Sequence, residues 1–343
     1  MKTKILLIAL VLIVSACKDL RYHYYTRIND DGTIFKRIVA EGDSSKIYSN
    51  PFSFDINDGW NVSYDKKMDE DSEDTLFVVI VEKTFLNVAA VNKDLVPEND
   101  SVYKDNISLS INSKFRGFFT FHQYSETFKQ RFPFKHLSVD DYLSRDEYAY
   151  FFEDDTSIVQ NMSKADLEAF EEQGEAKFWD YLTSTLGIEF VQLTNELAYQ
   201  SQKEVLTESD SLFVLQLFKS SVDDGPELVE ICQLTDQQMN ATWLSEAYAD
   251  GYFEHFEKQI DDEVIMLADN NYSAEIEVPG LLFATNANSI DNNSAKWSFC
   301  RGSFLYKDYI LTLEYRTINY WAFIIIGVLF IILVVSFIVK RRA

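Results

Sequence analysis

Cysteine is the rarest reactive residue type in this chain, and its first occurrence stands in a pattern that predicts covalent chemistry. Cys17 follows Val14-Ser15-Ala16, and signal peptidases cut after segments with small residues three positions and one position before the bond. A cysteine directly after that cut is where a lipoprotein receives its diacylglycerol thioether. We therefore predict that Cys17 is lipidated, with an ordinary secreted N-terminus and an incidental cysteine as the alternative.

The segment before Cys17 has the organisation of a signal peptide. Lys2 and Lys4 provide a positive start, and ten apolar residues, 5–14, follow. Ten residues are too few to cross a hydrocarbon core roughly 30 Å thick, so we expect removal on export rather than a permanent span. Residues 1–16 are predicted to be a lipoprotein signal peptide.

Cys232 and Cys300 are the other two thiols of the chain. An exported domain can oxidise them, and the disulfide would close a loop of about 69 residues, which stabilises by roughly 4 kcal/mol on the chain-entropy model. Two buried free cysteines, which behave as small apolar residues, are the alternative.

Other residue types give little sign of catalysis or metal binding. The histidines lack the spacing of zinc ligands, and no nucleophile elbow, Walker A loop or dinucleotide-binding motif occurs. The acidic run 69–74 lacks the glycine that a calcium loop needs at its sixth position and is expected to be a solvated loop. We predict no cofactor, no metal and no catalytic site. A hydrolase with carboxylates hidden among the 55 acidic residues is the less favoured alternative.

A second membrane signal lies near the C-terminus. Residues 321–339 carry no charge, and as a helix they would span about 28 Å, enough for the hydrocarbon core. We therefore predict a transmembrane helix over residues 318–339 and, by the positive-inside rule, a cytoplasmic tail over 340–343. A buried core helix is the alternative. The predicted anchor residues are an interfacial aromatic and three cations: Trp321, Lys340, Arg341 and Arg342.

The charge of the chain limits its partners. The formal net charge is −24; taking the five terminal basic residues from the 31 leaves 26 against 55 acidic ones, a charge of −29 for residues 17–317. Such a surface repels nucleic acid, and it repels anionic lipid headgroups unless a local basic patch exists. The two membrane signals predict a single-pass protein of the cytoplasmic membrane whose residues 17–317 face outward.

The order of the expected elements is strands, then helices, then strands. Residues 21–40 are expected to form a hairpin, because Asn29-Asp30-Asp31-Gly32 is a turn sequence. Polar loops are expected at 65–74 and 92–106. Further strands are expected at 60–64, 76–85, 107–121, 274–278, 296–300 and 308–315.

The helices are expected in between. Ser138 could cap a first helix, and Ser163 begins a capping box for a second that Gly187 could end. Thr235 or Thr242 is expected to open another long helix. Their wide aromatic stripes could form a core or line a lipid pocket.

This order predicts an α+β fold. A mixed or antiparallel sheet would combine N- and C-terminal strands, with a helical insertion at about 135–270 and one C-terminal transmembrane helix. No Gly/Ser linker separates two parts, so one composite extracytoplasmic domain is preferred.

Short motifs at the two ends resemble a known family. The run Val278-Pro279-Gly280-Leu281-Leu282-Phe283-Ala284-Thr285-Asn286-Ala287-Asn288, then Lys296-Trp297 and Asp308-Tyr309, is similar to the end of LppM-type lipoprotein domains, and Asp31-Gly32 matches their early turn. The resemblance covers roughly 60 residues, none of them in the helical region. It implies binding of a lipid-like ligand in the cell envelope rather than catalysis, and it assigns no site residues.

We therefore expect a non-catalytic, membrane-tethered envelope domain that binds a hydrophobic ligand or an envelope protein partner. A structural or assembly subunit of an envelope complex is the alternative. An apolar cavity of several hundred cubic ångströms would favour the ligand, whereas a filled core with a large exposed apolar patch would favour assembly.

Overall fold

β-Strands from both ends of the chain pair with each other, which confirms the predicted α+β fold. They belong to a sheet unit of residues 20–129, 270–299 and 309–343, and a helical unit contains residues 130–269 and 300–308. The computed structural model describes residues 20–56, 59–68, 75–95, 105–153, 155–221, 225–266 and 271–342.

The sheet unit contains two sheets rather than one. Within the described residues, the first has the strand order β3-β4-β2-β1-β7-β10-β9 and the second β5-β6-β11-β8. N- and C-terminal strands meet in both, through the parallel pair β1–β7 and the antiparallel pair β6–β11. The strands are β1 (Arg21–Ile28), β2 (Ile34–Gly42), β3 (Asn61–Met68), β4 (Thr75–Phe85), β5 (Ile107–Arg116), β6 (Phe119–Phe128), β7 (Asn271–Glu277), β8 (Leu281–Thr285), β9 (Ser289–Asp291), β10 (Ser294–Cys300) and β11 (Tyr309–Ile318).

The core between the two sheets is aromatic and also contains a buried ion pair. Tyr24 of β1 meets Phe128 of β6 edge to face, with the ring centroids 5.3 Å apart. Lys36 of β2 donates to Glu126 of β6 at 2.5 Å, and both side chains are almost completely buried. The Tyr124 hydroxyl also donates to Glu126. An ion pair and aromatic packing therefore join the two sheets.

Local turn chemistry explains where the strand predictions succeed and fail. The β1–β2 hairpin is confirmed, with Gly32 in the left-handed region at φ 83°. The single strand expected over 107–121 is wrong: Gly117, at φ 65°, reverses the chain between β5 and β6. Glycine at the first position of a two-residue hairpin loop allows this φ without steric cost.

The expected polar loops are also shorter than predicted. β3 continues to Met68 by pairing with β4, although most of its side chains are exposed. The short helices of the sheet unit include α3, whose Asn92 side chain bonds both backbone groups of Leu109 on the edge strand β5. These helices are α2 (Ser44–Tyr48) and α3 (Val88–Asp94).

The central helical insertion is confirmed, and its core consists mainly of aromatic rings. Phe190 is fully buried and lies within 6.2 Å, between ring centroids, of Phe218, Phe253 and Phe256. The helices are α4 (Arg145–Phe152), α5 (Lys164–Gln200), α6 (Glu208–Ser220), α7 (Leu228–Met239), α8 (Trp243–Ala249) and α9 (Glu254–Met266), with short 3₁₀ turns η1 (Val139–Asp141), η2 (Thr156–Val159) and η3 (Arg301–Phe304).

The first two predicted helices have different bounds in the structure. Ser138 caps only η1, and α4 begins at a separate capping box formed by Ser144 and Glu147. Ser163 caps α5 as predicted, but Gly187 does not end that helix. A Cβ at Gly187 would lie 2.8 Å from Leu215 of α6, so the glycine permits close helix packing.

The long helix expected from Thr235 or Thr242 is three helices. Asn240 adopts the left-handed conformation at φ 53° and ends α7, and Gly251, at φ 80°, separates α8 from α9. The Asp236 carboxylate accepts the backbone N–H of Leu244 at 3.1 Å and that of Ser245 at 2.8 Å, so it caps α8.

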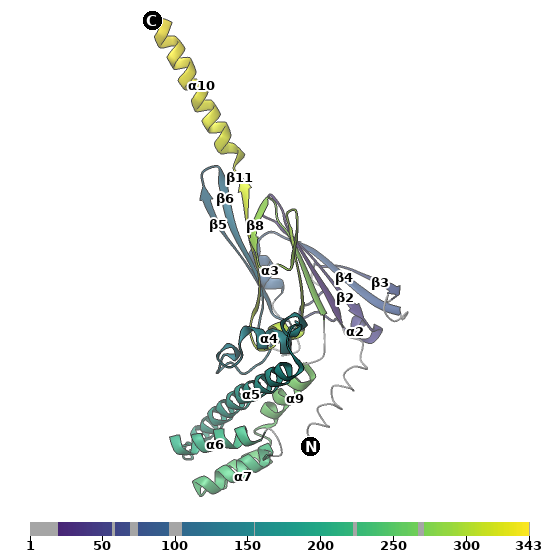
Figure 1. The fold of residues 1–343 in the computed structure, drawn as a ribbon, viewed down its shortest axis with the longest axis vertical. Helices are drawn as coiled ribbons and strands as arrows, with labels where there is room; N and C mark the ends of the chain where they lie inside the picture. The colour runs from purple at the N-terminus through teal and green to yellow at the C-terminus, as the bar shows by residue number, and fades with distance from the viewer. Residues whose placement is uncertain are drawn as a thin grey trace. The chain divides into compact units, whose positions relative to one another are not determined.

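The last helix, α10 (Tyr320–Arg342), follows β11 with a single intervening residue (Figure 1). Within the described residues, it is the helix that is long and apolar enough to cross a membrane, and nearly all its apolar side chains are exposed. A long apolar helix without a protein covering indicates association with a membrane.

Candidate functional site

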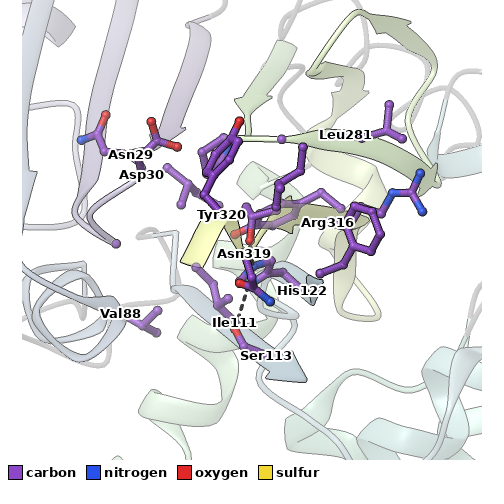
Figure 2. Close-up of a pocket in the computed structure, with 18 of the residues that line it drawn as sticks. Asn29, Asp30, Val88, Ile111, Ser113, His122, Leu281, Arg316, Asn319 and Tyr320 are labelled. Carbon is purple, nitrogen blue, oxygen red and sulfur yellow. Dashed lines mark hydrogen bonds between the residues drawn. The ribbon is translucent and has the colours of Figure 1, made fainter. Parts of the chain in front are cut away.

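A cavity of about 1030 Å³ lies in the sheet unit at the end where β11 leads into α10. Its walls come from the β1–β2 turn, the start of α3, strands β5, β6 and β11, and the turn before β8 (Figure 2). The apolar side chains of the lining are Ile28, Val88, Ile111, Phe119, Leu281, Tyr315 and Ile318. Polar and charged side chains, including Asn29, Asp30, Asn87 and Arg316, share the lining with these apolar groups. A cavity of this size and mixed lining can hold a small amphipathic molecule.

A row of side chains across three strands provides one polar part of the lining. Ser113, His122 and Tyr315 are register partners on β5, β6 and β11, so they lie on one face of the sheet. The His122 ring stacks on Tyr315 with the centroids 4.5 Å apart. Its Nδ1 lies 2.7 Å from Ser113 Oγ, and its Nε2 lies 3.0 Å from Thr317 Oγ1.

Burial changes the protonation equilibria in this row. Desolvation lowers the pKa of His122 below its ordinary value and raises the pKa of Tyr315 to about 12. Both shifts favour the neutral form, because a low-dielectric environment penalises charge. At neutral pH the row is therefore polar but uncharged.

A serine beside a histidine invites comparison with hydrolase chemistry. In a catalytic triad, the second ring nitrogen donates to a carboxylate that orients the base. In the described part of the chain, the second ring nitrogen of His122 bonds the Thr317 hydroxyl. A hydroxyl can fix the ring but cannot stabilise an imidazolium as a carboxylate does. The arrangement is suited to positioning the polar end of a ligand.

The turn before β8 closes one side of the cavity and depends on glycine. Pro279-Gly280 carries the chain from β7 in the first sheet to β8 in the second. A Cβ at Gly280 would lie 2.3 Å from the Arg316 carbonyl oxygen, which no other residue could accommodate without moving the backbone. The glycine thus allows β8 to lie against β11.

Two further cavities are less suited to an apolar ligand. One of about 650 Å³ is lined by charged residues of the first sheet, including Arg27, Arg37 and Glu82. The other, of about 370 Å³, lies in the helical unit near Leu197 and Trp243. Among the described residues, no group of three or more potential metal ligands is found.

The predicted cysteine sites are only partly described. Cys17 and the signal segment 1–16 lie outside the described residues, as does the acidic run 69–74. Among the described residues, no disulfide joins Cys232, which is buried, to Cys300, which is half-buried. Burial raises the pKa of Cys232 to about 12, and Cys300 donates to the Phe152 carbonyl at 2.9 Å.

The predicted anchor residues lie at the two ends of α10. Trp321 is at its start and stacks on Phe115 of β5, with the ring centroids 5.6 Å apart. Lys340 and Arg341 lie at its end, followed by Arg342. The contribution of β5 and β6 to this region was not predicted, although Gly117 between an alternating run and an aromatic-rich run was a usable hairpin signal.

Comparisons with known proteins give a likeness at the level of fold. The NMR structure of the folded domain of LppM from Mycobacterium tuberculosis is similar at 8% identity with a TM-score of 0.30, covering 88% of this chain and 91% of that chain. No family model and no curated protein matches the sequence.

Proposed function

We propose that this protein is a membrane-tethered, non-catalytic domain that binds one lipid-like molecule in the cavity beside α10. The cavity itself is the observation that carries the proposal. It has a volume of about 1030 Å³, and its lining combines apolar side chains, the neutral row of Ser113, His122 and Tyr315, and the charged residues Asp30 and Arg316. Hydrocarbon would occupy the apolar part, and the hydroxyl and imidazole groups would bond a polar head.

The position of the cavity supports a ligand that comes from a bilayer. Asn319 and Tyr320, where α10 begins, are part of the cavity lining. A lipid could therefore move between a membrane and the cavity without crossing a long aqueous path. In this proposal residues 1–16 are removed, Cys17 carries the lipid anchor, residues 17–317 face outward, 318–339 span the cytoplasmic membrane and 340–343 are cytoplasmic.

Native mass spectrometry of the full chain, released from detergent, tests the binding. We expect one co-purified lipid-like molecule per chain, identified after extraction. Val88→Trp places an indole in the cavity (Figure 2) and should abolish retention. Leu86→Trp is the matched control, because Leu86 is 81% exposed and is not part of the lining.

The outcomes separate ligand binding from the alternatives. Absence of lipid from the unmodified chain would overturn the proposal and favour a structural or assembly subunit. Equal retention by Val88→Trp and Leu86→Trp would place any bound lipid outside this cavity.

A further inference from the structure

The tip of the β5–β6 hairpin combines exposed aromatic and cationic side chains. This hairpin tip, residues 114–119, has the sequence Lys-Phe-Arg-Gly-Phe-Phe. Phe115 is 56% exposed and Phe118 is 36% exposed, although the core of the same unit is rich in buried aromatics. Large aromatic residues on an exposed hairpin loop need a reason other than core packing.

The hairpin tip is fixed to the first turn of α10. The backbone N–H of Asn319 donates to the Phe118 carbonyl at 2.8 Å, and its side chain donates to the Gly117 carbonyl at 2.9 Å. The Phe118 ring lies 4.5 Å from that of Phe323, between centroids. Since Phe323 belongs to the apolar helix, Phe118 lies at the depth where the hydrocarbon region would begin.

The charge of this region is opposite to that of the whole protein. No aspartate or glutamate occurs in residues 106–125, 278–290 or 315–343, although the chain has 55 acidic residues. Lys114 and Arg316 both pair in register with Phe121, and the Arg316 guanidinium lies 4.8 Å from the Phe119 ring centroid. This is a local basic patch in an acidic protein, and it lies on the β5, β6 and β11 side of the start of α10. On another side, Asp30 of the β1–β2 turn lines the cavity that also includes Tyr320.

Distances along the strand show how far the patch is from the bilayer. Arg116 and Ile318 both pair with Phe119, so Arg116 lies level with Ile318, two residues before α10. A strand rises about 3.3 Å per residue, so Arg116 lies roughly 7 Å from the start of α10 along the strand direction. A lipid headgroup layer has a similar thickness, so Arg116 would lie within it. Lys114, level with Arg316, lies roughly 13 Å away, close enough for its long side chain to reach phosphate groups.

We propose that the hairpin tip is a second membrane-binding element, which inserts Phe115 and Phe118 at the headgroup boundary and binds anionic phospholipid through Lys114, Arg116 and Arg316. A spanning helix leaves a domain free to tilt and rotate. Two attachment points beside each other fix the orientation of the sheet unit on the leaflet that α10 enters. This inference does not depend on ligand binding in the cavity.

Photocrosslinking of the full chain in vesicles tests the inference. Benzoylphenylalanine replaces Phe118 in one variant and Tyr64 in the control, because Tyr64 is a half-exposed aromatic on β3 of the same unit. The vesicles contain phosphatidylcholine with or without phosphatidylglycerol. After irradiation, mass spectrometry should find phospholipid adducts at position 118 and none at position 64.

The charge requirement is tested in the same preparation. The adduct yield at position 118 should rise with phosphatidylglycerol, and Lys114→Gln and Arg116→Gln should each reduce that gain about fivefold, which is the ~1 kcal/mol expected for a cation near an anionic surface. Adducts to a second copy of the chain, no lipid adduct at 118, or equal lipid adducts at 64 would each overturn the proposal. A gain unaffected by both substitutions would overturn the role of the cations.

Discussion

The interiors of the sheet unit and the helical unit are built on different principles. Between the sheets, Lys36 and the Tyr124 hydroxyl both donate to Glu126, and a cavity remains at one end of the sheet unit. The helical unit has a core of interlocking aromatic rings around Phe190 and Tyr181, and its own cavity of about 370 Å³ is smaller. The difference indicates that charge and polar chemistry matter in the first unit and volume matters in the second. The aromatic stripes of the predicted helices pack against one another in a core, and the cavity of about 1030 Å³ lies in the sheet unit.

The ion pair between the sheets should give the largest effect. Glu126→Gln leaves the buried ammonium of Lys36 without its counter-charge, and Lys36→Met leaves the carboxylate alone. Each single substitution should destabilise the sheet unit by about 3–5 kcal/mol, because an unpaired buried charge is costly. Hydrogen exchange of the β2 and β6 amides in the full chain measures this unit separately.

A double variant provides the control for this prediction. Lys36→Met with Glu126→Gln removes both charges and keeps an acceptor for Tyr124. It should recover most of the loss, because replacing a whole buried pair is often near neutral. A double variant that is less stable than either single variant would show that shape, rather than charge, limits this core.

Volume should decide the corresponding change in the helical unit. Phe190→Leu removes part of a fully buried ring and should cost about 1–2 kcal/mol, through lost transfer free energy and an incompletely filled space. Tyr199→Leu on the same helix is the control, since Tyr199 is 84% exposed and should change stability little. Exchange of the α5 amides reports the difference. Equal effects at the two positions would contradict the filled-core description.

The two cysteines give a contrast within the helical unit. A pKa of about 12, against 9.0 for an unperturbed thiol, lowers the thiolate population of Cys232 about a thousandfold at pH 8. Iodoacetamide should therefore modify partly exposed Cys300 in the folded chain well before Cys232. Both should react after denaturation without reductant, and failure of both under those conditions would show the disulfide instead.

Signals close together in sequence predicted their elements well. Asn29-Asp30-Asp31-Gly32 is complete within four residues, and the hairpin formed as expected. The N-cap at Ser163 and the apolar run of α10 are equally local, although the full capping box expected at Ser163 does not form. At Asn240 one residue decided between two local conformations, and the pattern on either side gave no warning. At Gly117 a hairpin signal was present in the sequence, but the prediction did not use it.

The candidate site could not be predicted, because it depends on pairings between distant segments. His122 meets Thr317, 195 positions away, only because β6 pairs with β11. The sequence showed four histidines without ligand spacing, and spacing is uninformative when the partners lie on separate strands. The prediction that Gly187 ends its helix was wrong for the same reason, because the close contact that requires this glycine is with Leu215 on another helix.

The pH response of His122 gives the smallest effect, and it tests whether the cavity row is as described. Burial lowers the pKa of His122, so the folded protein binds a proton here less readily than the unfolded chain does. Its contribution to stability is therefore fully present above pH 6.5, the ordinary histidine pKa, and is lost as pH falls through the lower folded-state pKa. An NMR titration of the His122 ring should give a midpoint below 6.5.

His122→Gln can still bond Ser113 and should remove that part of the acid sensitivity of the sheet unit. A midpoint above 6.5 would mean that a charged imidazolium is tolerated there, and the row would then favour an anionic head group over a neutral one.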